Sequence, residues 1–298
     1  MLRSLLSPPW SLEIRDEAPL SVIVVLTGHA HLVTGDGAQT ALGSGDIAIV
    51  RGPDAYTVSD RLRTPPQAVI HPGQVCTDPL GNPLSGLSDL GVRTWGNDPD
   101  GPDVLLTGTY QLRSETSRRL LEALPAQLVQ PVAITGRPLL DWLAQEVGRD
   151  DPGQAAVLDR LLDLLLVSTL RTWFARPEIA APGWYVAHAD PVLAPVLRVI
   201  EHRPEHPWTV ASLAAVAGVS RAALARRFTE VVGEPPMTFL THWRLALAAD
   251  LLLEPGATLT AVARQVGYGS PFALSAAFTR VRGVSPRAHR APEPARQV

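Results

Sequence analysis

Near its C-terminus the chain carries the same sequence pattern twice, about fifty residues apart. The first copy reads LAAVAGVSRAALARRF from Leu213 to Phe228, and the second reads VARQVGYGSPFALSAAF from Val262 to Phe278. Each copy combines a small residue in a first helix, a glycine after it, a capped second helix and a buried Leu…Phe pair. This arrangement predicts a helix-turn-helix, and two such units can place two recognition helices on one DNA without dimerisation. Double-stranded DNA is therefore the expected partner.

Charge is distributed unevenly between the two halves of the chain. At 298 residues the chain is long enough for two domains, and its formal net charge is -3. Residues 190–298 carry 12 arginines against eight acidic residues, whereas residues 1–189 carry 14 against 21. The basic excess coincides with the repeat, as expected for a surface that binds phosphate. Because the sequence contains no lysine, arginine must supply every cationic phosphate contact.

The sequence indicates a soluble, cytoplasmic protein with no membrane segment. Cys76 is the only cysteine, which excludes an intramolecular disulfide and a cysteine-based metal site. The opening MLRSLLSPPW is too short, and interrupted too early by proline, for a secretory signal. The most apolar stretch, Leu161 to Phe174, contains Asp163 and Arg171 and does not predict a bilayer span.

Residues 1–112 have the pattern of β-structure. Apolar and β-branched runs separated by Gly, Pro and Asp turns predict a small sandwich or barrel. The predicted strands are Ser21–Val33 with a break at Gly28, Asp46–Val50, Ala68–Ile70 and Val104–Leu112. The stretch 72–102 is rich in Gly, Pro and Asp and predicts a long irregular excursion.

From Ser114 onward the apolar residues recur with a helical period. Ser114 is placed to cap a first helix, Leu139–Val147 predicts a second and Gln154–Phe174 a third. The third is apolar on most faces, so more than one neighbour must cover it. Two interpretations stay open: it packs between two helices of its own chain, or residues 113–175 form a homodimer interface. Prolines and a glycine over 177–191 mark a link to the C-terminal half.

The C-terminal half contains capped helices in the order that two helix-turn-helix units require. Thr209, Ser220 and Ser270 each precede a helical pattern as N-caps. Pro271 follows the last of them at the first helical position, where its missing N–H leaves no hydrogen bond unmade. A longer helix from Pro236 to about Leu253 is expected to span roughly 27 Å and to separate the two units.

Residues 190–290 resemble the DNA-binding domain of the AraC/XylS family of bacterial transcription regulators. The resemblance rests on WTVASLAAVAGVSRAALARRF, GEPPMTFLTHWRLALAADLL and VARQVGYGSPFALSAAFTRVRGVSPRAHR. The N-terminal half is similar to the cupin-type sensor domain often fused to it, through PPWSLEIRD, VVLTGHAHLV and GSGDIAIVRGPDAY. The implied fold is multidomain α+β, with a cupin-like β-barrel over 1–112, a helical linker or dimerisation region over 113–180 and an all-α domain with two helix-turn-helix units over 190–298. The implied function is sequence-specific transcription regulation, with no enzymatic activity.

The resemblance also implies which residues contact DNA. Arg226 is the expected base reader, because Arg can bond both acceptors of guanine, while Arg227 is expected to meet phosphate or an acidic neighbour. The second unit departs from the family pattern, since Ala276 stands where an Arg is frequent, so it is expected to add mainly non-specific affinity. Phe272 is expected to contact a thymine methyl group. Phosphate contacts are expected from Ser270, Arg280 and Arg282. The full predicted set is Ser220, Arg221, Ala222, Ala225, Arg226, Arg227, Ser270, Pro271, Phe272, Ser275, Ala276, Arg280 and Arg282.

The N-terminal half predicts a ligand pocket without a metal or other cofactor. Metal-binding cupins use a His-x-His, a Glu and a later His that face the barrel interior. His29 and His31 lie on one face of a strand, but they follow Gly28, and the expected ligand positions near Trp10 contain no histidine. The pair is therefore interpreted as partly solvated. A small organic effector is expected between Trp10, the His29/His31 face and Tyr56.

Two alternatives to a ligand-responsive regulator remain. In the first, the N-terminal half of a DNA-binding protein only dimerises or docks a partner. In the second, a metal-dependent cupin enzyme is fused to the DNA-binding domain. If the protein activates transcription, RNA polymerase is a further expected partner.

Overall fold

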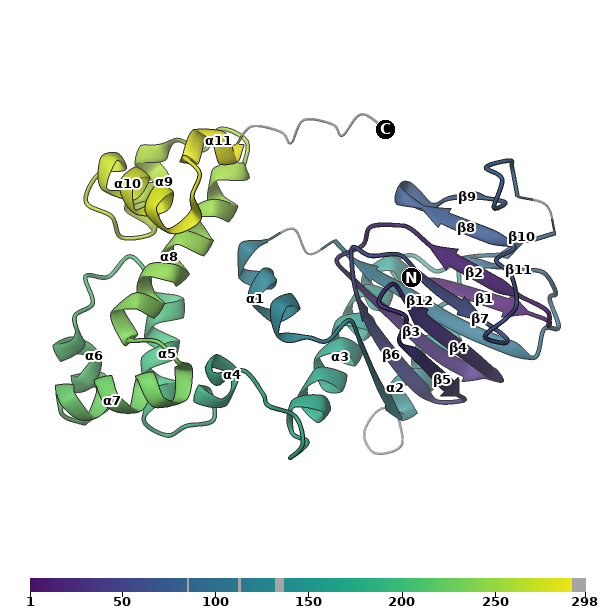
Figure 1. Cartoon of the computed structure of the whole chain (residues 1–298), viewed down its shortest axis with the longest axis horizontal. Coiled ribbons are helices and arrows are strands. Elements are labelled where there is room, and N and C mark those ends of the chain that lie inside the picture. The colour runs from purple at the N-terminus through teal and green to yellow at the C-terminus, as the bar shows by residue number, and fades with distance from the viewer. Residues whose placement is uncertain (85, 112–113, 132–136, 291–298) are drawn as a thin grey trace. The chain divides into compact units, whose positions relative to one another are not determined.

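The computed structural model describes residues 1–84, 86–111, 114–131 and 137–290 (Figure 1). Contacts divide the chain into two compact units, of which the first consists of residues 1–113 and 121–179. The second consists of residues 114–120 and 180–298. A short segment thus joins the C-terminal unit from a position about sixty residues earlier in the chain. Within the described ranges, no helix combines the length and apolarity needed to cross a membrane.

The first unit is built on two β-sheets. Its strands are β1 (Leu2–Leu6), β2 (Ser11–Ile14), β3 (Leu20–Thr27), β4 (His29–Thr34), β5 (Gln39–Gly43), β6 (Asp46–Arg51), β7 (Tyr56–Ser59), β8 (Ala68–His71), β9 (Val75–Thr77), β10 (Ser88–Gly91), β11 (Thr94–Gly96), β12 (Asp103–Tyr110) and β13 (Gln127–Pro131). The seven-stranded sheet has the order β10-β11-β1-β12-β3-β6-β13, and the six-stranded sheet has the order β5-β4-β7-β2-β8-β9. Most pairs are antiparallel, while β1 with β11 and β2 with β8 are parallel.

Side chains from both sheets form one apolar core, which includes Leu6, Trp10, Ile23, Leu32, Tyr56 and Leu105. Strand β4 shows the alternation that creates it, since Ala30 and Leu32 are buried while His29 is exposed. Helix α3 (Gln154–Phe174) covers the outer face of the seven-stranded sheet: a Cβ added to Gly108 of β12 would clash with the side chain of Leu162. Glycine at 108 therefore lets the helix approach the strand closely.

Two further helices belong wholly or partly to the first unit. Helix α1 (Glu115–Ala123) begins after Ser114, whose hydroxyl accepts a 3.1 Å hydrogen bond from the backbone N–H of Ser117, as its predicted capping role requires. Helix α2 (Arg137–Glu146) packs with α3. Residues 121–123 of α1 are grouped with the first unit and residues 114–120 with the second.

The second unit is otherwise all-helical. Its helices are α4 (Gly183–Ala187), α5 (Leu193–His202), α6 (Val210–Val216), α7 (Arg221–Val232), α8 (Pro236–Leu253), α9 (Leu259–Gln265), α10 (Pro271–Arg282) and α11 (Pro286–Arg290). They enclose two separate cores, one around Phe228 and Phe239 and one around Leu274 and Phe278. The 18-residue helix α8 contributes to both cores, which confirms its predicted place between two helix-turn-helix units.

The β-region differs from expectation in two respects. The sheets do not close into the predicted barrel, because no ladder among the described residues joins one sheet to the other. The stretch 72–102, predicted to be irregular, contributes the short strands β9, β10 and β11, and strands β1, β2, β5, β7 and β13 were not predicted either. These strands have three to five residues each, and their hydrogen bonds to other strands, rather than local alternation, make them part of a sheet.

Candidate functional site

The first helix-turn-helix unit is formed by α6, α7 and the turn between them. Thr209 caps α6 through a reciprocal pair of hydrogen bonds with Ser212, and the Ser220 hydroxyl accepts the N–H of Ala223 at the start of α7. Gly218 adopts φ +65°, the left-handed conformation that the turn needs. Phe228 of α7 packs edge-on against Phe239 of α8, with 5.6 Å between ring centroids. The turn, the caps and the buried aromatic pair fix the position of α7, the candidate recognition helix, relative to α6 and α8.

One face of α7 projects into solvent. Arg221, Ala222 and Arg226 are exposed, and Ala225 is partly exposed beside them. The Arg226 side chain is 77% exposed, and its contact with Glu230 is long, at 3.8 Å between Nε and Oε1. Such an ion pair between exposed groups is weak, so the Arg226 guanidinium can turn toward a base edge at little cost.

Arg227 lies on a different face and is engaged within the protein. Its Nε and Nη2 donate to the Asp190 carboxylate at 2.9 and 2.6 Å. The same carboxylate accepts the backbone N–H groups of Val192 and Leu193 at the start of α5. The hydrogen bond from Arg227 holds the pKa of Asp190 below its usual value, although burial opposes this shift. Of the two partners predicted for Arg227, the structure contains the acidic neighbour.

The second helix-turn-helix unit repeats this construction with a different exposed surface. The Ser270 hydroxyl accepts the N–H of Ala273, and Pro271 occupies the first position of α10. Phe272 is 84% exposed. Ser275 is partly exposed and Ala276 exposed on the same helix. The recognition surface of α10 therefore offers an aromatic ring and few hydrogen-bonding groups.

The predicted phosphate-binding arginines of α10 behave differently from one another. Arg280 is exposed at the end of the helix. Arg282 is only 14% exposed, because its Nη1 lies 2.9 Å from Oε1 of Glu115. Its guanidinium also lies over the Phe278 ring, 5.4 Å from the centroid. The structure thus directs Arg282 toward the protein, contrary to the prediction of a phosphate contact.

Arg264 is a candidate that the sequence interpretation missed. It is exposed in the last turn of α9 and lines a hollow of about 540 Å³ together with Thr260, Tyr268 and Ser270. This hollow lies at the start of α10, where unpaired backbone N–H groups favour anions. A basic residue just before a helix-turn-helix turn is the signal that was available in the sequence.

The two helix-turn-helix units touch each other through Arg244 of α8. Its Nε and Nη2 donate to the carbonyl oxygens of Pro204 and His206, at 2.7 and 2.8 Å. Gly267, in the turn of the second unit, lies directly against this contact: a Cβ at this position would be 2.7 Å from both Arg244 Nη2 and the carbonyl oxygen of Glu205. Burial lowers the pKa of Arg244, partly offset by Tyr268 and Glu205.

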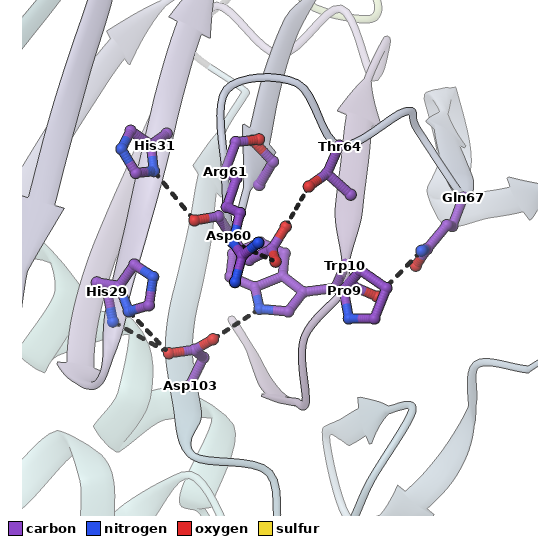
Figure 2. Close-up of polar contacts among 10 residues, drawn as sticks. Pro9, Trp10, His29, His31, Asp60, Arg61, Thr64, Gln67 and Asp103 are labelled. Carbon is purple, nitrogen blue, oxygen red and sulfur yellow. Dashed lines mark hydrogen bonds and ion pairs between the residues drawn. The ribbon is translucent and has the colours of Figure 1, made fainter.

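Of the four residues predicted to form a ligand pocket, Trp10, His29 and His31 lie around Asp103 and Asp60 (Figure 2), whereas Tyr56 lines a cavity to which none of these three contributes. Trp10 is fully buried and its indole N–H donates to Asp103 Oδ2 at 2.8 Å. His29, on the exposed side of β4, meets the other oxygen of Asp103, with a 3.1 Å bond from its backbone N–H. His31 contacts the backbone carbonyl of Asp60 at 3.1 Å. No cluster of three or more His, Cys, Asp or Glu in the described ranges could hold a metal ion.

A cavity of about 350 Å³ lies elsewhere in the first unit and is lined by Tyr56. Its wall is mostly apolar and includes Leu12, Ile14, Ile23, Val58, Ile70 and Leu105. Asp16 and Trp95 also line it, and the Trp95 indole N–H is buried. The Tyr56 hydroxyl is buried without a hydrogen-bond partner of good geometry among the described residues. Burial raises the pKa of Tyr56, only partly offset by the nearby Ser21 hydroxyl, so Tyr56 stays a neutral donor.

Comparison with known protein families assigns a description to each half of the chain. A family described as "Cupin" matches residues 1–175. A family described as "Helix-turn-helix domain" matches residues 213–291. The first match covers both sheets and helices α1 to α3, and the second covers both recognition helices.

Several known proteins are similar to this chain over most of its length. An AraC-like transcription regulator of Streptomyces antibioticus is 33% identical over 263 residues, which are 87% of this chain and 82% of that protein. The HTH-type transcriptional regulator AlkR of Acinetobacter baylyi is 28% identical over 296 residues, 94% of this chain and 90% of AlkR. Among solved structures, the DNA-binding domain of AdpA in complex with a target DNA is 37% identical, with a TM-score of 0.32, over 34% of this chain and 90% of that domain.

Proposed function

The chain belongs to the AraC family of DNA-binding transcription regulators and carries an N-terminal cupin domain, and we propose that it senses a small, mostly apolar organic molecule in that domain. Like its relatives, it is a regulator and not an enzyme. In this proposal, ligand binding changes DNA affinity, which requires the ligand to bind the two states of the protein with different affinity.

At the DNA, the two helix-turn-helix units have different roles in the proposal. The first reads sequence through Arg226, whose exposed guanidinium can bond both acceptors of a guanine. The second adds affinity that depends little on sequence, through phosphate contacts from Arg264 and Arg280. Phe272, exposed at the start of α10, contributes an apolar contact suited to a thymine methyl group.

One observation carries the ligand proposal: Tyr56 lines a mostly apolar cavity, and its buried hydroxyl has the Ser21 hydroxyl nearby but no hydrogen bond of good geometry among the described residues. A buried polar group without a hydrogen bond is costly, and a ligand that supplies the acceptor removes that cost. At about 350 Å³ the cavity falls within the range of small-molecule sites. The ligand class is therefore a neutral, mostly apolar molecule with at least one hydrogen-bond acceptor.

Thermal unfolding of the intact chain against a panel of small organic molecules and divalent metal ions tests the proposed ligand. At ten times its dissociation constant, a cavity ligand should stabilise the first unit by about 1.4 kcal/mol. Tyr56→Phe should weaken that ligand about fivefold, because it removes one hydrogen bond. Tyr110→Phe is the matched control, since the Tyr110 hydroxyl is also buried but does not line the cavity. Stabilisation by metal ions alone would favour a metal-dependent cupin enzyme fused to the DNA-binding domain. Stabilisation by no molecule of a broad panel would favour an N-terminal half that only dimerises or docks a partner.

A stripe of exposed apolar side chains on α3 supports a homodimer as part of the same proposal. Val157, Leu164 and Val167 are 37%, 54% and 51% exposed and lie on one face of the helix. Leu164→Glu is expected to lower the dimer affinity at least tenfold, because it buries a charge at the interface. Light scattering over a concentration series measures this change. Leu253→Glu replaces an equally exposed leucine of the other unit and should leave the oligomeric state unchanged.

A further inference from the structure

Residues 114–120 belong by their contacts to the DNA-binding unit, although they follow directly on the strands of the cupin domain in sequence. We refer to them as the brace segment. From Glu115 onward they form the first part of helix α1. Two of their side chains reach two different parts of the DNA-binding unit.

Glu115 connects the brace segment to the second helix-turn-helix unit. Its carboxylate Oε1 lies 2.9 Å from Nη1 of Arg282, in the last turn of recognition helix α10. Its backbone N–H donates to Asp250 Oδ1, near the end of α8, at 2.6 Å. Arg282 in turn lies over the ring of Phe278, the buried aromatic residue of the second unit. Glu115 and Arg282 are 20% and 14% exposed, so solvent screens their attraction less than it does at the surface.

Arg119 connects the brace segment to the first helix-turn-helix unit. Its guanidinium lies over the ring of Phe239, at the start of α8, with 4.8 Å from Cζ to the centroid. Its Nη2 also lies 3.8 Å from Oε1 of Glu234, in the turn that joins α7 to α8. Phe239 packs directly on Phe228, the buried aromatic residue of recognition helix α7. Phe228 and Phe278, which are equivalent in the repeat, are therefore each one residue away from the brace segment.

We propose that the brace segment positions the two helix-turn-helix units relative to each other, and that Glu115 and Arg119 are positioning residues for DNA binding. The proposal rests on the DNA-binding function given above. Two recognition helices can occupy one duplex together only if their separation matches successive major-groove faces, roughly 34 Å. A segment that contacts both ends of α8 restricts the bending of that helix. The two helix-turn-helix units are then held at a fixed separation before they bind DNA. The same segment is covalently continuous with the cupin domain, so it is suited to transmit a ligand signal.

The test compares two duplexes in binding experiments with the full chain. One is selected from random sequence by the wild-type protein, and the other is the same duplex shortened so that it spans the first helix-turn-helix unit alone. The Glu115→Gln/Arg119→Leu double variant should lose about tenfold in affinity for the long duplex. A loss of this size is typical of substitutions that weaken the energetic coupling between two sites. Its affinity for the short duplex should stay within about twofold of wild type, since the contacts of α7 with DNA are intact.

Glu201→Gln is the control for loss of a paired carboxylate elsewhere in the same unit, because Glu201 pairs with His188 on the α4–α5 side. It should leave both affinities unchanged. Amide hydrogen exchange of α7 and α10 in the double variant shows whether both units remain folded. An unchanged ratio of the two affinities, or an equal loss on both duplexes, overturns the proposal. Failure of the wild-type chain to select any duplex would instead overturn the proposed function.

Discussion

Replacing Gly267 by alanine is expected to lower the free energy of unfolding of the second helix-turn-helix unit by about 2–5 kcal/mol. Two effects add at this position. Gly267 has φ +79°, a conformation that strains an alanine. The new methyl group would also lie 2.7 Å from the carbonyl oxygen of Glu205 and 2.8 Å from its Cα, neither of which is the flexible end of a side chain. The backbone of the turn must therefore shift, and the adjoining Arg244 contact with it.

The repeat supplies a control for this prediction. Gly218 is the equivalent glycine of the first unit, with φ +65°, but a Cβ there would meet nothing within 4 Å. Gly218→Ala should therefore cost only the backbone strain, about 1–2 kcal/mol. Amide hydrogen exchange in the intact chain measures both effects separately, on α6 and α7 for one variant and on α9 and α10 for the other. An equal cost at both glycines would mean that the turn of the second unit does not press on residues 204–206.

Arg226→Ala is expected to reduce affinity for a selected duplex by about 1–3 kcal/mol and to relax discrimination at one base pair. The reason is the exposed position of the Arg226 guanidinium, which only the weak contact with Glu230 restrains. Competition binding with the selected duplex and with each of its single-base substitutions measures this. The affinity of the variant should become nearly independent of the base at one position.

Arg280→Ala is the companion variant for the second unit. Arg280 is exposed at the end of α10 and is assigned to phosphate, so its loss should weaken selected and random DNA alike. It should also reduce the slope of log affinity against log salt by about 1. If Arg226→Ala behaved in the same way as Arg280→Ala, the assignment of base reading to the first unit would be wrong.

The C-terminal helices were predictable because their signals are local. Thr209, Ser220 and Ser270 act as N-caps where the sequence places them, and each bonds a backbone N–H within its own first turn. The glycine and the Leu…Phe pair of each repeat recur at fixed spacing. Such features depend on neighbours a few residues away, so they can be identified from the sequence alone.

The arrangement of the cupin domain was less predictable, because it depends on contacts between residues far apart in sequence. Trp10 was expected to line a ligand pocket, but its indole N–H is taken up by Asp103, 93 positions later. Gly28 is constrained in the same way: a Cβ there would lie 2.9 Å from the backbone of Asp103. His29 alternates with buried Ala30 as a strand predicts, yet alternation alone does not say which of the two faces looks inward.

Local sequence also did not predict which arginines of the recognition helices bind carboxylates of the protein instead of facing DNA. Arg227 and Arg282 both stand on recognition helices of a basic domain, and both bind carboxylates instead. Their partners, Asp190 and Glu115, lie 37 and 167 positions away in the chain. An arginine on a recognition helix therefore marks a candidate DNA contact, and only the packing around it decides whether the guanidinium is available.

The DNA-binding unit is discontinuous in sequence, and this has a consequence for its folding during synthesis. Residues 114–120 leave the ribosome about sixty residues before the rest of their unit, and Glu115 precedes Arg282 by 167 positions. N-terminal domains generally fold first as the chain emerges, so the cupin domain can be complete while the brace segment still lacks its partners. A nascent chain thus finishes the part assigned to sensing before the brace contacts of its second recognition helix can form. An isolated fragment that starts at residue 180 would contain both recognition helices but would lack the brace segment and its contacts with them.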